Sequence, residues 1–146
     1  MSDWKKNLVT DDAGAHRILR DSSRVAVLGI KPESHAAQAA FYVANFLQHS
    51  GYDVVPVPVY YPEVTEILGH PVYRSLQAIP GDVDLVVVFR RPADIPPHVP
   101  DILAKRPKAV WFQLGIRNDA AAEELARAGI EVVQDRCTMV EVRRMA

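Results

Sequence analysis

Positively charged side chains recur directly after short Val-rich segments of this chain. Guanidinium and ammonium groups are the side chains that recognise phosphate, and arginine does so with a planar, bidentate fork. The tandem arginines of Arg90-Arg91-Pro92, which follow the apolar run 85–89, are the most suggestive. The pattern predicts a local phosphate-binding site, with solvated surface charges as the alternative. The candidates are Lys31, His35, Arg90, Arg91, Arg117 and Arg136.

A glycine and a pair of tyrosines follow the first two Val-rich segments. Gly29 has no side chain, so a phosphate or a pantetheine arm can approach its backbone; a simple tight turn is the alternative. Loop 29–34 has one glycine where the dinucleotide fingerprint G-x-G-x-x-G has three, which disfavours an ordinary NAD site. Tyr60-Tyr61-Pro62 suits either a cover for an adenine or a thiol arm, or an ordinary loop of packed aromatics.

Patterns for catalysis and metal binding are scarce. The five histidines lack H-x-x-x-H spacing, and no serine stands in a G-x-S-x-G context. Cys137 follows Asp135-Arg136 and precedes an expected C-terminal helix, whose N-terminus and the arginine would favour a thiolate. An inert thiol is the alternative. Nothing in the sequence demands an enzyme.

These residues are positioned by an alternation of Val-rich runs and helical spacing, which is typical of an α/β fold. The runs are short, β-branched and nearly continuous, as parallel strands covered on both faces are. A short sixth strand at the sheet edge is expected near Val72-Tyr73, before a turn or helix at 75–79. The five main strands are expected at 25–30, 54–57, 85–89, 109–112 and 131–133.

Helical spacing predicts the connections between the strands. Apolar residues at 36–47 form one face of a helix that stops at Gly51, and a second helix begins at Asn118 or Asp119 and stops at Gly129. Segment 94–106 is expected to be a helix with prolines in its first turn, and 11–20 an amphipathic helix beside the sheet.

In an open parallel sheet, ligands bind beyond the carboxyl ends of the strands, where the strand order reverses. The sequence therefore predicts a site among five segments that follow the expected strands. They are 29–34, 56–61, 89–92, 113–117 and 135–137.

Composition sets the class of protein. A chain of 146 residues fits one domain, and 49% hydrophobic with 24% charged residues is typical of a soluble globular protein. The formal charge of −1 provides no field for nucleic acid or an anionic membrane, so neither is an expected partner. Residues 1–12 lack an apolar stretch, and a single cysteine agrees with a reducing compartment, so we expect a cytoplasmic protein.

Several motifs together resemble those of the small stand-alone CoA-binding domain proteins. They are 25–29 (VAVLG), 84–91 (DLVVVFRR), 109–115 (AVWFQLG) and the terminal Asp135-Arg136-Cys137, and the match runs from about residue 20 to 144. The resemblance implies a single domain over 1–146. Its fold would be a three-layer, Rossmann-like, doubly wound parallel sheet of five to six strands, similar to the nucleotide-binding domain of the succinyl-CoA synthetase alpha subunit.

The resemblance also implies that coenzyme A, or an acyl-CoA, binds at the switch point between strands 25–30 and 85–89, without catalysis by this chain alone. The family usually reads Val-Asn-Pro-Lys after the second strand, where this chain has Val57-Pro58-Val59-Tyr60, so Lys31 or His35 is the candidate replacement for a phosphate-binding lysine. The implied ligand contacts are Gly29, Ile30, Lys31, Ser34, Pro56, Val57, Pro58, Tyr60, Phe89, Arg90, Arg91, Pro92, Gln113, Gly115, Ile116 and Arg136.

Two alternatives stay open. The chain would serve as the nucleotide-binding subunit of an acyl-CoA ligase or transferase only with a partner chain, because 146 residues leave no room for the remaining catalytic parts. It would otherwise be an NAD(P)-binding or redox-sensing protein that uses Cys137. A homo-oligomer is compatible with each of these hypotheses.

Overall fold

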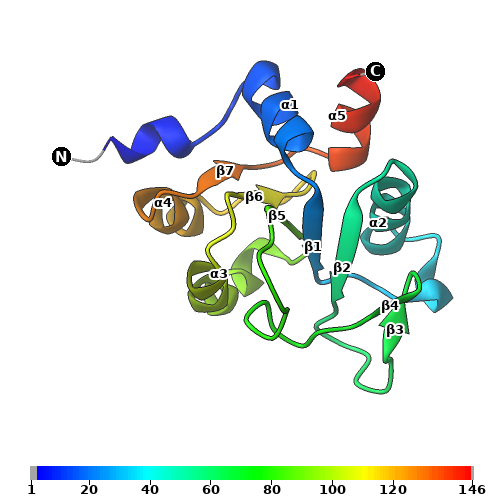
Figure 1. Ribbon diagram of the computed structural model, residues 1–146. Coiled ribbons are helices and arrows are strands. Elements are labelled where there is room, and N and C mark those ends of the chain that lie inside the picture. The colour runs from blue at the N-terminus through cyan, green and yellow to red at the C-terminus, as the bar shows by residue number, and fades with distance from the viewer. Residues whose placement is uncertain (1–2, 146) are drawn as a thin grey trace.

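The computed structural model describes residues 3–145 and contains one five-stranded parallel sheet (Figure 1). The strands lie in the order β2-β1-β5-β6-β7, and β1 pairs with both β2 and β5 along its length. Within these residues no helix combines the length and the apolar character that a bilayer span requires. The strands are β1 (Arg24–Leu28), β2 (Asp53–Val57), β5 (Leu85–Val88), β6 (Ala109–Phe112) and β7 (Glu131–Val133).

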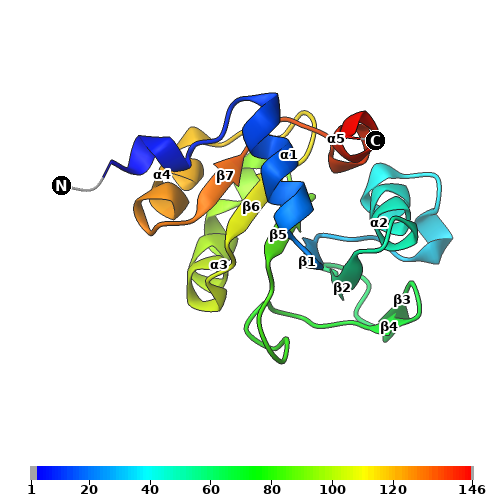
Figure 2. The ribbon, with the colours of Figure 1, turned by 45° about the horizontal axis from the view of Figure 1, so that its top comes forward.

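Helices cover both faces of the sheet, which confirms the predicted three-layer α/β architecture. Figure 2 shows α1, α2 and α5 on one face and α3 and α4 on the other. Short 3₁₀ turns complete the connections, at Trp4–Asn7, Glu33–His35, Pro92–Asp94 and Pro96–His98. The helices are α1 (Asp12–Asp21), α2 (Ala39–His49), α3 (Val99–Lys105), α4 (Asp119–Arg127) and α5 (Thr138–Met145).

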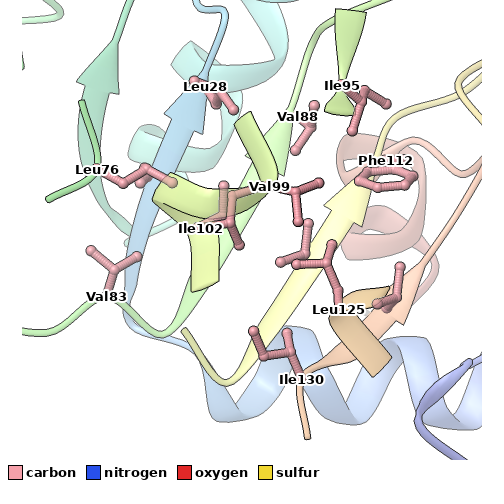
Figure 3. Packing of buried hydrophobic residues seen from close by; sticks show 14 of the residues in the cluster. Leu28, Leu76, Val83, Val88, Ile95, Val99, Ile102, Phe112, Leu125 and Ile130 are labelled. Carbon is pink, nitrogen blue, oxygen red and sulfur yellow. The ribbon is translucent and has the colours of Figure 1, made fainter. Parts of the chain in front are cut away.

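Both faces of the strands are buried, because side chains alternate across a strand and each face meets a helical layer. In β1, Ala26 and Leu28 face α3 and α4, whereas Val25 and Val27 face the other layer. Figure 3 shows Leu28, Val88 and Phe112 of the sheet with Val99 and Ile102 of α3 and Leu125 of α4. This double burial explains why the strands are continuous Val-rich runs.

The strand order reverses between β1 and β5, as the sequence predicted. From β1 the chain passes through α2 to β2 on one side, and it then crosses to β5 on the opposite side of β1. The loops that leave these two neighbouring strands therefore diverge at their carboxyl ends. This divergence is the topological switch point of a doubly wound sheet.

The predicted sixth strand at Val72-Tyr73 is wrong. Those two residues form no strand, and β3 (Glu66–Ile67) pairs with β4 (His70–Pro71) in a separate antiparallel hairpin. Only the Tyr73 N–H reaches the main sheet, where it donates to the Pro56 carbonyl at 3.0 Å. Pro56 has no N–H to return the bond, so the outer edge of β2 supports no ladder there.

The helix predicted over 94–106 is shorter than expected. Its first part consists of the 3₁₀ turns Pro92–Asp94 and Pro96–His98, and α3 begins at Val99. An α-helix that began at residue 94 would need the N–H groups of residues 97 and 100 for its hydrogen bonds, and both residues are prolines. The 3₁₀ turns place His98 beside the loop that follows β5, where its Nε2 accepts from Arg90 Nε.

Candidate functional site

A cleft of about 410 Å³ opens at the carboxyl ends of β1, β2 and β5, at the switch point. Three loops line it, one from each strand, at 29–31, 59–61 and 89–91. The structure thus brings together a subset of the residues that the sequence predicted for the site. This subset is Gly29, Ile30, Lys31, Tyr60, Phe89, Arg90 and Arg91.

Gly29 is required by the close approach of two loops. Its φ is +87°, and a Cβ at this position would lie 2.3 Å from the Phe89 carbonyl oxygen. Its N–H donates to the Val57 carbonyl at 2.8 Å, while the Phe89 N–H donates to the Leu28 carbonyl at 2.8 Å. The glycine therefore has a structural reason independent of any ligand, and it brings the loops that carry Lys31 and Arg90 against each other.

Lys31 presents a positive charge to the cleft. The Lys31 Nζ donates to the neutral Gln38 Oε1, and the Lys31 backbone N–H donates to the Ala40 carbonyl at 3.1 Å. Across residues 3–145 no carboxylate lies within ion-pair distance of Lys31. The charge is thus oriented by an amide and stays uncompensated by an acid, as suits a group that binds an anion.

The tandem arginines differ in their surroundings. The Arg91 side chain is 81% exposed and donates to Asp94 Oδ2 at 2.8 Å, so its charge is partly compensated. The Arg90 side chain is only 14% exposed, and its Nε donates to His98 Nε2 at 3.2 Å. Burial, and after it the charge of Arg90, lower the pKa of His98 below its ordinary value, which keeps the imidazole neutral at neutral pH.

An aromatic wall closes the cleft on the β2 side. The exposed Tyr60 ring lies 5.4 Å from the Arg90 guanidinium carbon, in a cation–π arrangement. Tyr61 has a φ of +63°, and its hydroxyl lies 3.4 Å from His35 Nε2. Arg74 stabilises this loop by donating to the carbonyls of residues 60, 61 and 64 at 3.0, 2.9 and 2.7 Å. Sequence reasoning missed Arg74, which stands in no recognisable motif.

Some predicted contacts lie around the cleft but outside its lining. Ser34 is exposed, and its Oγ lies 2.9 Å from His35 Nδ1. Pro92 is exposed at the start of a 3₁₀ turn, where its carbonyl accepts from Asn118 Nδ2 at 2.9 Å. Pro56, Val57 and Pro58 are buried at the end of β2. Contact of these residues with a ligand stays a prediction.

A second group of predicted contacts lies farther along the sheet, after β6 and β7. Gln113 is buried, and its Oε1 accepts the Thr138 N–H at 3.0 Å at the start of α5. The Gly115 N–H donates to Asp135 Oδ1 at 2.6 Å, and the Ile116 carbonyl accepts the Asp135 N–H at 3.1 Å. These bonds join the two loops to each other and to α5, so both loops have structural roles.

Arg136 is held by the first residue of α1 and by the segment before it. It donates to Asp12 Oδ1 at 2.6 Å and to the Thr10 carbonyl at 2.8 Å. With Arg117 it lines a separate cavity of about 480 Å³ under the N-terminal segment, beside α4 and β7. The structure therefore divides five of the six predicted cations between two places, and His35 lines neither of them. The cleft at the switch point combines the cations that follow β1 and β5.

Similarity to known proteins defines the class of this protein. Residues 23–143 match the sequence family described as CoA binding domain. The chain is 32% identical over 123 residues to the uncharacterized protein YneT of Bacillus subtilis (strain 168), covering 84% of this chain and 87% of that protein. The protein belongs to the CoA binding domain family, which confirms the resemblance seen in the sequence.

Solved structures agree with this assignment. The structure of cell-free ID.343 from Thermus thermophilus is 37% identical, with a TM-score of 0.85 over 94% of this chain and all of that one. A hypothetical protein from Pyrococcus horikoshii OT3 is 32% identical, with a TM-score of 0.82 over 92% of each chain. The dinucleotide forming acetyl-coenzyme A synthetase 1 of Ca. Korarchaeum cryptofilum matches at 19% identity and a TM-score of 0.62, over 75% of this chain and 25% of that one. This last match shows a shared fold alone.

Proposed function

We propose that the protein binds coenzyme A, or an acyl-CoA, in the cleft at the switch point and performs no reaction on it alone. The observation that carries the proposal is the convergence of Lys31, Arg90 and Arg91 on one cleft in a chain whose formal charge is −1. A neutral protein with a local cluster of cations is suited to a small anion and not to a polyanion.

The lining of the cleft fits the chemistry of coenzyme A, which has phosphate groups, an adenine ring and an apolar pantetheine arm. Lys31 and Arg90 supply charge for phosphate, and the Tyr60 ring offers a face for the adenine or the thiol arm. Val59 adds apolar surface, whereas Ile30 is 1% exposed and packs in the core. A volume of about 410 Å³ lies within the usual range of roughly 300–1,000 Å³ for small-molecule sites.

A thermal-shift and calorimetric panel of CoA, acetyl-CoA, NAD, NADP and ATP tests the proposal. A ligand of the native state at 100 times its Kd adds about 2.7 kcal/mol to the free energy of unfolding. For a chain of this size that corresponds to a rise in Tm of roughly 5–10 °C. Absence of a shift at millimolar CoA refutes the proposal, and a shift with NAD or NADP instead supports the dinucleotide alternative.

Charge variants locate the site. Lys31→Gln removes one charge-assisted hydrogen bond, so we expect CoA affinity to fall about tenfold or more. Arg20→Gln is the matched control, because Arg20 is an exposed residue of α1 that does not line the cleft. CoA affinity that is equal in the two variants would place the ligand elsewhere, the cavity beside Arg136 being the next place to test.

The ligase or transferase alternative depends on a partner chain. We propose that this chain acts as a binding module, and a catalytic role would require a second polypeptide that supplies the reacting groups. Incubation of the purified protein with acetyl-CoA, followed by detection of free thiol, tests for catalysis without a partner. Thiol release above the rate without protein would contradict the non-catalytic assignment.

A further inference from the structure

Three contacts hold the Arg90 side chain in the wall of the cleft. Its Cδ lies 3.3 Å from the position that a Cβ on Gly29 would occupy, so the side chain crosses the bare glycine backbone. Its guanidinium carbon lies 5.4 Å from the centroid of the Tyr60 ring, and its Nε donates to His98 Nε2 at 3.2 Å. Only the last contact is a directional hydrogen bond within ordinary distance.

The Arg90–His98 bond defines the state of the imidazole. A guanidinium has only donor groups and stays protonated in proteins, so His98 Nε2 must accept with a lone pair. His98 is therefore neutral and has its proton on Nδ1. The charged groups that face it are Arg90, Asp94 and Asp101, and burial together with Arg90 lowers the pKa of His98.

His98 accepts this bond without a negative charge, unlike a carboxylate. Asp94 Oδ2 lies 3.9 Å from an Arg90 nitrogen but 2.8 Å from Arg91 Nε, so this carboxylate bonds mainly to Arg91. His98 orients the Arg90 guanidinium without neutralising its charge. Among the described residues neither terminal nitrogen of Arg90 forms a hydrogen bond, although one of them lies 3.9 Å from Asp94 Oδ2, so the pair can form a fork for phosphate.

We propose that His98 is a positioning residue for ligand binding, which holds the Arg90 guanidinium toward the phosphates of coenzyme A through a neutral imidazole. The inference rests on the proposed function. His98 lies in the 3₁₀ turn Pro96–His98 and does not line the cleft, so it acts through Arg90 and not by touching the ligand. The 3₁₀ turns before α3 thus serve to bring an acceptor behind the arginine.

A double-mutant cycle tests this coupling, with the Kd for CoA measured by calorimetry at neutral pH. His98→Leu removes the acceptor, and we expect about a tenfold loss of affinity. His98→Gln retains a neutral oxygen acceptor of similar reach and should restore most of the affinity. If His98 acts through Arg90, the double variant Arg90→Met with His98→Leu binds no more weakly than Arg90→Met alone.

Controls separate positioning from folding. The Tm of each variant reports its stability, and His49→Leu is the matched control, because His49 is an exposed histidine of α2 outside the cleft. Nitrogen NMR of the imidazole should show His98 as the neutral form with its proton on Nδ1. A protonated ring, or a proton on Nε2, contradicts the inference.

The outcomes distinguish the two proposals. If the wild-type protein does not bind CoA, the proposed function is refuted and the inference about His98 falls with it. If the wild type binds CoA but the losses of Arg90→Met and His98→Leu add, His98 has only a structural role. If His98→Gln binds as poorly as His98→Leu, the acceptor is not what matters, and the inference is likewise refuted.

Discussion

Substitution of Gly29 by alanine tests the claim that the cleft depends on the close approach of two loops. The added Cβ would lie 2.3 Å from the Phe89 carbonyl oxygen and 3.0 Å from its carbonyl carbon. Both are backbone atoms, so no side-chain rotation relieves the clash. The Phe89 N–H is bonded to the Leu28 carbonyl at 2.8 Å, and the end of β5 must therefore move away from β1.

Two unfavourable contributions to the free energy of folding add in Gly29→Ala. An L-residue in the left-handed region, here at a φ of +87°, costs about 1–2 kcal/mol relative to glycine. Forcing an extra methyl group into a packed site costs a further ~1–3 kcal/mol. We therefore expect the free energy of unfolding to fall by about 2–5 kcal/mol, a large part of the roughly 5–15 kcal/mol that stabilises a typical domain.

Urea unfolding provides the measurement, and Gly129→Ala is the matched control. Gly129 has a φ of +88°, but a Cβ placed there meets no heavy atom within 4 Å. Its substitution should cost only the backbone component, about 1–2 kcal/mol. CoA affinity should fall in Gly29→Ala and stay constant in Gly129→Ala. Equal destabilisation of the two variants would refute the reasoning, because the close contact with Phe89 would then have no energetic effect.

Two further predictions concern stability. Asp84 accepts from the Arg24 N–H and from Ser23, and these bonds, led by the one from Arg24, lower its pKa below the ordinary 3.8. The stabilisation from the Asp84 carboxylate is therefore present above pH 3.8 and is lost as the pH falls through its lowered folded-state pKa. Asp84→Asn should lower the free energy of unfolding by about 1–3 kcal/mol at neutral pH, and the variant should lose less stability in acid than the wild type. Urea unfolding at neutral pH and at acid pH measures both effects. The Trp111 indole is fully buried and donates to the Arg136 carbonyl at 2.8 Å, so Trp111→Phe should cost about 1–3 kcal/mol; an unchanged Tm by circular dichroism would contradict this expectation.

The sheet could be predicted from the sequence because its signal is local. Strands buried on both faces must be apolar at nearly every position, and all four residues of β5 and of β6 are buried. The glycines that end two helices have φ values of +104° at Gly51 and +88° at Gly129, which are conformations that favour glycine. The order of the strands, and with it the switch point, then follows from a few topological rules.

The errors arise where proline alters a local pattern. The segment after β5 is rich in proline and forms 3₁₀ turns where the first turns of an α-helix were expected. Pro56 has no N–H, so the outer edge of β2 lacks a hydrogen-bond donor at this position. Residues that contact the site from a distant part of the sequence stand in no recognisable sequence pattern. Arg74 bonds to carbonyls 10 to 14 residues away, and His98 becomes relevant only because its turn folds back behind Arg90. Such roles depend on tertiary structure.

The terminal Asp135-Arg136-Cys137 shows why a family motif does not by itself define a ligand contact. β7 is separated from β5 by β6, so its end lies about 10 Å from the end of β5 at the usual strand spacing. There the Arg136 side chain bonds to Asp12 and the Thr10 carbonyl, while its own carbonyl accepts the Trp111 indole N–H. An anion that reached Arg136 would have to compete with the Asp12 carboxylate. No carboxylate among the described residues competes in this way for Lys31. Because the charge of Lys31 is not compensated by an acid and that of Arg136 is, we favour the switch-point cleft as the place where phosphate binds.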